Sequence, residues 1–279
     1  MDHVITKKQI TDYCLSLTAD EKSIGTINKY RRDVTAFARW LNGRGVTKET
    51  ASGWKAHMKE SGYAPCTINS MLAAINGFFR FMGWGLRVKF LKIQRQMFRD
   101  TAKELTRAEY DKLLSTARKS GQERLALIME TLCATGIRIS ELCYITAEAA
   151  EAGRATISLK GKIRIILLPS KLCHKLLKYS KRRNIESGAI FLTKSGKGIT
   201  RRQVWFELKR LCETADVEAT KVFPHNLRRL FAVTYYKASH DIAHLADVLG
   251  HSSLETTRIY LTISGAEQAR QLDRLGLVS

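Results

Sequence analysis

The chain has 279 residues, which is enough for two modest domains with their own hydrophobic cores. Lysine and arginine outnumber aspartate and glutamate by 21, and the excess is spread over the first hundred residues and the remainder alike. This balance favours a polyanionic partner, with nucleic acid ahead of an anionic membrane surface. The polar N-terminus and the lack of a long apolar run argue against a secreted or membrane-spanning protein, so we expect a cytoplasmic one.

The six cysteines are scattered and form no C-x-x-C pair, which argues against a zinc ribbon or a redox motif. Most lie among apolar residues, as expected of small buried side chains in a reducing compartment. His240 and His244 are four residues apart, but no third ligand has a convincing spacing, so we expect no metal site. We expect no nucleotide cofactor either, because the glycine-containing loop at 194–198 lacks the Walker spacing.

Residues 1–85 are predicted to form a unit of four helices, because apolar residues recur at the helical period in four successive stretches. Thr47 is suited to cap the third helix. One face of the second helix is basic, and we predict that Lys29, Arg31 and Arg32 contact DNA from it. The alternative is a basic face that is simply solvated.

Residues 86–102 have weak periodicity and carry five basic residues. We expect an extended linker that lies near DNA phosphates, with a continuing helix as the alternative. Thr106 and Glu109 have the spacing of a capping box, so a second domain is expected over residues 103–279. After the helix that this box begins, further helices are expected at about 122–133, 140–144, 170–184 and 200–214.

Residues 155–168 hold the strongest strand signal in the chain. The residues from Thr156 to Leu159 alternate in polarity, and those from Ile163 to Leu167 are rich in β-branched side chains. Lys160, Gly161 and Lys162 make a tight turn between them, so we predict a β-hairpin.

The last quarter of the chain brings together residue types that suit a phosphodiester. His225 and Arg228 are three apart and would share one helix face. Gly250 can end a helix, His251 follows it, and two serines can then cap a short helix that carries Tyr260. Arginine binds phosphate oxygens, histidine moves protons and a phenol can attack. Each residue alone is more commonly a cap, core or surface residue, so the ordered set carries the inference.

This ordered set resembles the tyrosine recombinase family, which includes phage integrases, Xer recombinases and the integrases of mobile elements. The family's second box is H-x-x-R, then L-G-H, then a tyrosine nine residues on, and it matches His225, Arg228, His251 and Tyr260. The first box, T-G-x-R-x-S-E-L, matches residues 135–142. The length of the chain favours an Xer-like or small mobile-element recombinase.

The resemblance implies a mainly α-helical fold with a small β-hairpin. It implies an N-terminal core-binding domain of the SAM-like four-helix type and a C-terminal catalytic domain. Thr26, Tyr30, Asp33 and Phe37 follow the pattern of that core-binding domain, which grips one side of the duplex in the family. A short amphipathic tail follows Tyr260, and it is expected to dock on its own domain or on a neighbouring protomer.

The resemblance also implies an activity, namely site-specific recombination of double-stranded DNA. The reaction would pass through a 3′-phosphotyrosine intermediate and a Holliday junction without metal or nucleotide cofactor. The protein would be a monomer in solution and a homotetramer on paired DNA sites. The candidate catalytic residues that follow from the two boxes are Arg138, His225, Arg228, His251 and Tyr260.

The roles expected of these residues come from the family's chemistry. Tyr260 would be the nucleophile and His225 its base, and Arg138 and Arg228 would stabilise the transition state. His251 would bind the scissile phosphate and orient the site.

The family also places a catalytic lysine on the hairpin, usually in a G-K-G-x-K-x-R setting. We assign it to Lys160, the candidate acid for the leaving 5′-hydroxyl, with Lys162 as the alternative because this turn is one residue shorter. Further DNA contacts in this domain are predicted for Lys162, Lys194, Lys197, Arg201 and Arg202. For the loop at 194–198, a mobile surface loop is the competing interpretation.

Three other functions are weighed against recombination. A type IB topoisomerase uses the same chemistry, but the chain length and the N-terminal helical pattern favour a recombinase. A DNA-binding protein without activity could retain the same residues. Binding to a membrane surface lacks an amphipathic anchor with a strongly charged face.

Overall fold

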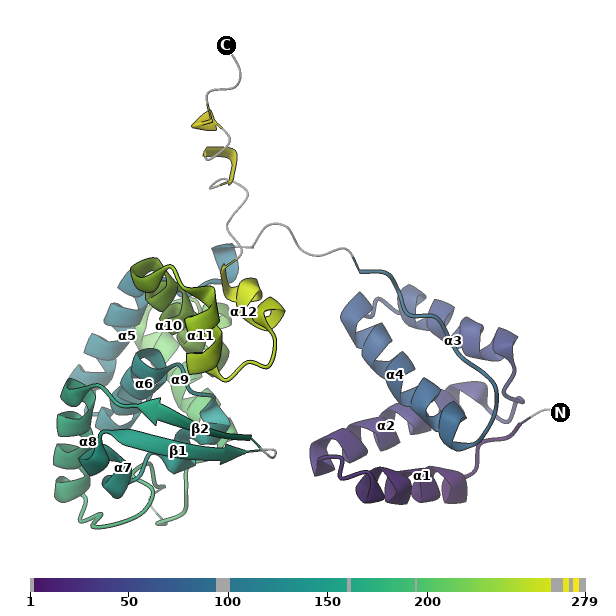
Figure 1. Ribbon diagram of the computed structural model, residues 1–279, viewed down its shortest axis with the longest axis horizontal. Coiled ribbons are helices and arrows are strands. Elements are labelled where there is room, and N and C mark those ends of the chain that lie inside the picture. The colour runs from purple at the N-terminus through teal and green to yellow at the C-terminus, as the bar shows by residue number, and fades with distance from the viewer. Residues whose placement is uncertain are drawn as a thin grey trace. The chain divides into compact units, whose positions relative to one another are not determined.

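The computed structural model describes residues 3–93, 101–159, 162–193, 195–261, 268–270 and 273–275, with the backbone alone at 101, 159 and 162. The chain divides into two compact units, Met1–Arg95 and Gln96–Ser279. Both are built mainly from helices, and the one sheet in the described ranges is a pair of strands (Figure 1). The predicted fold class is confirmed. Among the described residues, no helix has both the length and the apolar character that crossing a membrane requires.

The N-terminal unit packs four helices around one hydrophobic core. Phe37, Phe78 and Phe79 are fully buried in it. Thr47 caps the third helix as predicted, because its hydroxyl accepts a hydrogen bond from the backbone N–H of Thr50 at 3.2 Å. The helices are α1 (Lys7–Ala19), α2 (Ile24–Leu41), α3 (Lys48–Glu60) and α4 (Pro65–Phe81).

Residues 86–91, the first part of the predicted linker, pack against this core. The side chain of Asn76 on α4 exchanges two hydrogen bonds of 2.9 Å with the backbone of Val88. Asn69 makes the same pair with Leu91, at 2.9 and 2.7 Å. The two asparagines are seven residues apart and therefore lie on one face of α4. Residues 86–91 form no helix and are docked on α4, because these side chains satisfy peptide groups at Val88 and Leu91. Residues 94–100 of the predicted linker lie outside the described residues, and its last two residues belong to a short 3₁₀ turn, Thr101–Lys103.

We expect Asn76→Ala to lower the free energy of unfolding of the N-terminal unit by about 1–2 kcal/mol, because two partly buried peptide groups at Val88 lose their partner. Urea unfolding followed by tryptophan fluorescence measures this change, because Trp84 is buried in the same core. The control is Asn28→Ala on the exposed surface of α2. Equal unfolding midpoints for the two variants would contradict the prediction.

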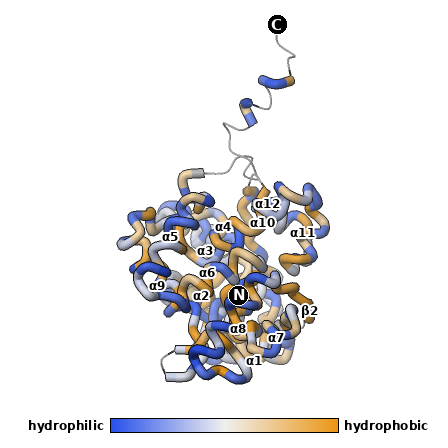
Figure 2. Tube along the Cα trace, turned by 90° about the vertical axis from the view of Figure 1, so that its left-hand side faces the viewer, coloured by the Kyte–Doolittle hydropathy of each residue, from blue (hydrophilic) through white to orange (hydrophobic). Residues whose placement is uncertain are grey.

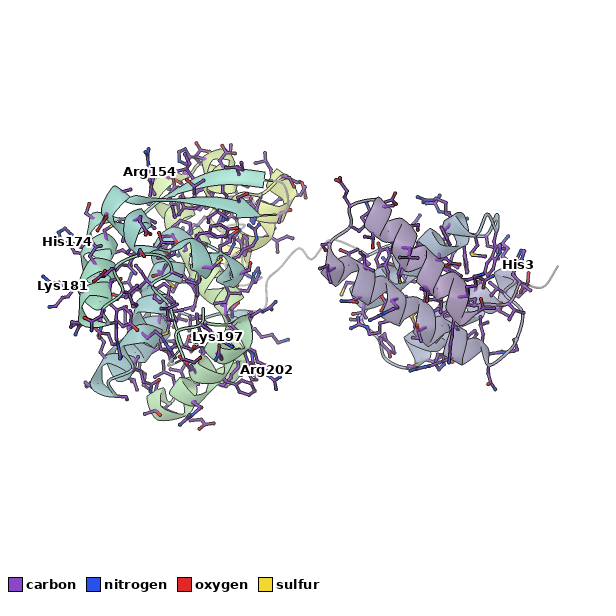
Figure 3. All side chains as sticks on the ribbon, turned by 90° about the horizontal axis from the view of Figure 1, so that it is seen from below. His3, Arg154, His174, Lys181, Lys197 and Arg202 are labelled. Atoms are coloured by element: carbon purple, nitrogen blue, oxygen red, sulfur yellow. The ribbon has the colours of Figure 1, made fainter. Side chains whose placement is uncertain are left out.

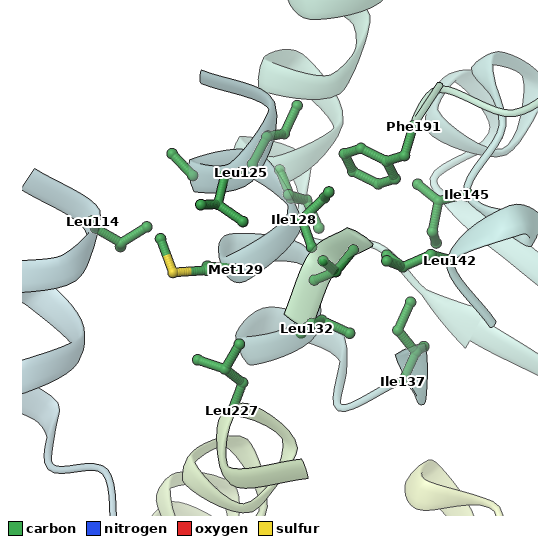
Figure 4. Packing of buried hydrophobic residues seen from close by; sticks show 14 of the residues in the cluster. Leu114, Leu125, Ile128, Met129, Leu132, Ile137, Leu142, Ile145, Phe191 and Leu227 are labelled. Carbon is green, nitrogen blue, oxygen red and sulfur yellow. The ribbon is translucent and has the colours of Figure 1, made fainter. Parts of the chain in front are cut away.

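The C-terminal unit has its own core, with α6 at the centre of the view in Figure 4. Ile128, Met129 and Leu132 of that helix have no exposed surface, and Leu227 of α10 is equally buried. The helices are α5 (Arg107–Lys119), α6 (Glu123–Thr135), α7 (Ala147–Ala152), α8 (Ser170–Arg182), α9 (Arg201–Ala215), α10 (Pro224–Ser239), α11 (Ile242–Leu249) and α12 (Leu254–Leu261), with the short 3₁₀ turns η1 (Thr101–Lys103), η2 (Ile139–Tyr144) and η3 (Ala219–Lys221).

The predicted hairpin is present as β1 (Arg154–Leu159) and β2 (Lys162–Leu167), with Leu159 paired to Lys162. Figure 2 colours β2 mainly as hydrophobic. Yet Ile163, Ile165 and Leu167 are 74, 60 and 76% exposed, so three aliphatic side chains face outward. The alternation of a strand therefore directs Arg164 to the inner face, beside its cross-strand partner Ile157.

Two local predictions have different outcomes. The capping box of Thr106 and Glu109 is confirmed, with hydrogen bonds of 3.2 and 2.8 Å between side chains and backbone. The helix expected at about 140–144 is instead the 3₁₀ turn η2. A connection this short is commonly a 3₁₀ turn. The side chain of Glu141 caps the start of this turn by accepting a hydrogen bond from the backbone N–H of Arg138 at 2.7 Å.

Candidate active site

Two helices end in glycine at one place in the C-terminal unit. Gly136 ends α6 with φ +63°, and Gly250 ends α11 with φ +64°. A Cβ atom at Gly136 would overlap the ring of Phe231, and one at Gly250 would lie 2.7 Å from Cδ of Arg164. Both positions therefore require glycine for conformation and for space, which explains the glycine in each of the two sequence boxes.

Arg228 on α10 is the buried cation of the site and is only 2% exposed. Its Nη1 donates to the carbonyl of Gly136 at 2.6 Å, and its Nη2 donates to the carbonyl of Leu249 at 2.7 Å. The same Nη2 lies 3.0 Å from Nε2 of His251. Both carbonyls belong to helix C-termini, which lack partners within their own helices. Arg228 thus joins the ends of α6 and α11 and is held in place by them.

A second charged group was not predicted from the sequence. Glu141 is 1% exposed, and it accepts hydrogen bonds from Nη1 of Arg138 at 3.0 Å and from Nη2 of Arg164 at 2.7 Å. Arg164 also donates to the carbonyl of Val248 at 2.7 Å, and Arg138 lies 3.5 Å from that of Gly250. The only sequence signal was that Glu141 lies in the first box and Arg164 ends the hairpin's K-x-R.

The balance of charge at this site is positive. Arg138, Arg164 and Arg228 contribute three guanidinium groups, and among the described residues Glu141 is the carboxylate paired with two of them. Guanidinium groups that converge in a partly buried place favour an anion with several oxygen atoms.

His251 follows the end of α11 and is held through both ring nitrogens. Its Nε2 faces Arg228 at 3.0 Å, and its Nδ1 lies 2.8 Å from Oγ1 of Thr257. Thr257 is fully buried on α12. Sequence reasoning missed Thr257, because nothing in the local pattern shows which side chain a threonine on a short helix will meet.

Tyr260 on α12 is 5% exposed. Its ring stacks on His251 with centroids 5.7 Å apart, and it lies 5.4 Å from the ring of His225. His225 is in the first turn of α10 and is exposed. The structure therefore brings together His225, Arg228, His251 and Tyr260, with Arg138 beside them.

The remaining catalytic candidate, Lys160, lies outside the described residues, and so does Lys194 of the predicted DNA contacts. Lys162 is described through its backbone alone, in β2. The pairing of Leu159 with Lys162 leaves residues 160–161 as the connection, so the choice between the two lysines stays a prediction.

The predicted DNA contacts of α9 and its preceding loop lie at the surface. Lys197, Arg201 and Arg202 are exposed, and Figure 3 labels Lys197 and Arg202. The guanidinium of Arg202 lies 5.5 Å from the ring of Phe206. The charge of Arg201 is one of several that lower the pKa of His225.

In the N-terminal unit, each of the three predicted contacts has a partner on its own helix, and for two of them this partner is a carboxylate. Asp33 is 2% exposed, and it pairs with Lys29 and, at 3.4 Å, with Arg32. Arg31 is exposed and donates to Asn28 at 3.2 Å. Lys29 and Arg32 thus neutralise a buried carboxylate, and contact with DNA stays a prediction for all three.

Burial and the clustered arginines lower the pKa values of the site's bases. Burial first, and then the charges of Arg228, Arg138 and Arg164, lower the pKa of His251 to about 4. His225 has an exposed side chain, yet the protein atoms around its ring partly desolvate it, and this effect, followed by the charges of neighbouring arginines, lowers its pKa. The pKa of Arg228 falls to about 10, mainly through burial. At neutral pH His251 is therefore uncharged, His225 is favoured as a base, and Arg228 stays positive.

The sequence matches two known protein families. Residues 103–267 match the phage integrase family, and residues 10–84 match the phage integrase, N-terminal SAM-like domain. The chain belongs to the phage integrase family. The tyrosine recombinase XerA of Thermococcus kodakarensis is 30% identical over 279 residues, covering 95% of this chain and 96% of that protein. The predicted membership of the tyrosine recombinases, and the prediction of a recombinase enzyme, are confirmed.

Solved structures resemble this integrase-family chain in fold. XerH recombinase bound to its difH substrate in a pre-cleavage complex is 20% identical with a TM-score of 0.69, over 95% of this chain and 84% of that one. A lambda integrase tetramer bound to a Holliday junction is 18% identical with a TM-score of 0.71, over 91% of this chain and 76% of that one.

The stability of this recombinase should depend on the charge of His251. The pKa is about 4 in the folded state and about 6.5 in the unfolded state, so the unfolded chain binds more protons between these values. The stabilisation is present above pH 6.5 and is lost as the pH falls toward 4. We expect a loss of about 1–3 kcal/mol in the free energy of unfolding across this window.

The measurement is urea unfolding at several pH values for the wild type and His251→Gln. Glutamine does not titrate, and its amide oxygen can accept from Arg228. The carboxylates titrate in both proteins, so the difference between the two pH profiles isolates His251. Parallel profiles would show that His251 does not have the lowered pKa.

Proposed function

We propose that this tyrosine recombinase breaks and rejoins double-stranded DNA at specific sites through a covalent bond between Tyr260 and a 3′-phosphate. The observation that supports this most is the excess of guanidinium groups at a buried tyrosine. Arg138, Arg164 and Arg228 converge there, and within the part of the chain that the structure describes Glu141 is the carboxylate that pairs with two of them. A phosphodiester group carries the oxygen atoms that such a site can bind.

The phenol oxygen of Tyr260 attacks phosphorus, and the bond from phosphorus to the 5′-oxygen breaks. The products are a 3′-phosphotyrosine and a free 5′-hydroxyl. His225 takes the phenolic proton, and its lowered pKa keeps it unprotonated for this task. Lys160 gives a proton to the departing 5′-oxygen. Because the phosphoester bond is retained on Tyr260, a 5′-hydroxyl can reverse the step and no nucleotide is consumed.

Negative charge grows on the non-bridging oxygens in the transition state, and Arg138 and Arg228 stabilise it. Arg228 is fixed by two carbonyls and does not have to reorganise during the reaction. A pKa of about 10 still leaves it protonated at neutral pH. We also propose that His251 binds the scissile phosphate and orients the site, and its Nε2, 3.0 Å from Arg228 Nη2, supports a role in orienting that guanidinium.

Complete recombination requires two strand exchanges, and we propose a homotetramer on paired DNA sites with a Holliday junction between the exchanges. The lambda integrase tetramer on such a junction has the same fold and supports this view. Contacts from both units to phosphates would supply most of the affinity, so binding should weaken steeply with salt. The protein would be a monomer before assembly and would act in the cytoplasm.

The test uses double-stranded DNA from the flanks of the coding sequence, nicked near candidate sites so that the cleaved strand is lost and the covalent complex accumulates. We expect a protein–DNA band on a denaturing gel, and after digestion a peptide that carries the nucleotide on Tyr260. A nucleotide on another residue, or tight specific binding without any adduct, would overturn the proposal.

A further prediction concerns the leaving group. We expect Lys160→Ala to slow cleavage about 10²-fold or more, because the 5′-oxygen then leaves without a proton. A substrate with sulfur at the 5′-bridging position should restore the rate, because a thiol with a pKa of about 8.5 leaves unprotonated. Lys162→Ala is the matched control. If Lys162→Ala shows the loss and the rescue instead, the role belongs to Lys162.

A further inference from the structure

Thr257 is a buried hydroxyl beside the site that the steps above do not use. It has no exposed surface, and its Oγ1 lies 2.8 Å from Nδ1 of His251. It is three residues before Tyr260 on α12, so both side chains lie on the same side of that helix. Both contact His251, Thr257 through its hydroxyl and Tyr260 through its ring.

The contacts of His251 determine which ring nitrogen carries the proton. A guanidinium has donors and no acceptor, so Nη2 of Arg228 can meet Nε2 of His251 only if Nε2 accepts. A neutral imidazole then carries its proton on Nδ1, which faces Oγ1 of Thr257. The lowered pKa of His251 agrees with a neutral ring. Thr257 is therefore the acceptor for the proton that Arg228 excludes from Nε2.

We propose that Thr257 is a positioning residue that holds His251 in the Nδ1–H tautomer and thereby links the placement of Tyr260 to that of the His251 ring beside Arg228. The link follows from the chain, because Thr257 and Tyr260 share one short helix. If α12 moves and withdraws Tyr260, His251 loses its Nδ1 partner in the same motion. The ring of His251 and the nucleophile are then placed together or not at all, while the two carbonyls still hold Arg228. The effect on catalysis rests on the proposed function, whereas the tautomer does not.

The decisive variant is Thr257→Val, which keeps the shape of threonine and removes the hydroxyl. A buried Nδ1–H without a partner is costly, so His251 should leave this tautomer or turn its ring. Thr257→Ser keeps the hydroxyl and should keep the tautomer. Thr256→Val is the matched control, because Thr256 is the neighbouring threonine on the same helix and is exposed. If the Thr257→Val variant does not fold, Thr257→Ala is used in its place.

The first measurement is the ¹⁵N shifts of the histidine rings in the full chain at neutral pH. We expect Nδ1–H for His251 in the wild type, in Thr257→Ser and in Thr256→Val. In Thr257→Val we expect Nε2–H or a mixture, with the ring turned away from Arg228, because an Nε2–H group cannot face a guanidinium donor. An unchanged Nδ1–H signal in folded Thr257→Val would overturn the proposal, because a threonine that only fills space would leave the tautomer as it is.

The second measurement is single-turnover cleavage of the nicked substrate. Thr257→Val should cleave about 10–100-fold more slowly, by analogy with metal-ligating histidines that lose the partner that orients them. Thr257→Ser should recover most of the rate, and DNA affinity should not change. A wild-type rate in Thr257→Val would count against the proposal. If the wild type itself forms no adduct, the proposed function fails, and the ring shifts alone decide the role of Thr257.

Discussion

Tyr260→Phe should abolish the covalent protein–DNA complex and leave DNA binding intact. The loss should be about 10⁴-fold or more, as when other covalent enzymes lose their nucleophile. Phenylalanine keeps the ring that packs on His251 and His225 at 5.7 and 5.4 Å. Only one oxygen is removed, so the free energy of unfolding should change by about 1 kcal/mol or less. Loss of activity with retained binding would then be a loss of chemistry.

The experiment compares single-turnover cleavage and DNA affinity for the wild type, Tyr260→Phe and Tyr236→Phe. Tyr236 packs in the same hydrophobic cluster as Tyr260, so its variant controls for removing any phenol oxygen there. Tyr236→Phe should form the adduct as the wild type does. An adduct that persists in Tyr260→Phe would place the nucleophile elsewhere and remove the basis of the mechanism.

Most of the fold could be predicted from local sequence, because each helix depends on a periodic apolar face and on its caps. Thr47 and Thr106 cap α3 and α5 as predicted. Docking of residues 86–91 could not be predicted. It depends on Asn69 and Asn76, whose side-chain bonds to a distant backbone follow no local pattern.

The hairpin shows why the site was only partly predictable. Local rules place aliphatic side chains inward and charge outward, yet here Arg164 faces inward and Ile163 and Ile165 are exposed. Arg164 faces inward because its guanidinium donates a hydrogen bond to Glu141, which lies 23 positions earlier in the chain. Proteins most often break such a local rule at functional sites, where the chemistry requires a residue that the local pattern disfavours. The catalytic candidates of the two boxes were found by their order, whereas the contacts of Glu141, Arg164 and Thr257 required the folded chain.

Arg228→Lys should reduce cleavage about 10³-fold, although the charge is conserved. Arg228 spans two carbonyls and His251 at 2.6, 2.7 and 3.0 Å, through a planar group with donors on separate nitrogens. A lysine ammonium is a single point and cannot reach all three partners. Buried near Arg138 and Arg164, a lysine would also lose its proton more readily than the guanidinium does.

The variant should also lower the free energy of unfolding by about 1–3 kcal/mol, because a buried carbonyl at the end of α6 or α11 is left without a donor. Cleavage is therefore compared at a temperature where circular dichroism shows each variant folded. Arg229→Lys is the matched control, because Arg229 is adjacent on α10 and pairs with Glu104 at 2.8 Å, a pair that lysine can keep. It should cleave close to the wild-type rate. If Arg228→Lys cleaves equally well, charge alone is sufficient there, and the fixed geometry of the guanidinium is not what stabilises the transition state.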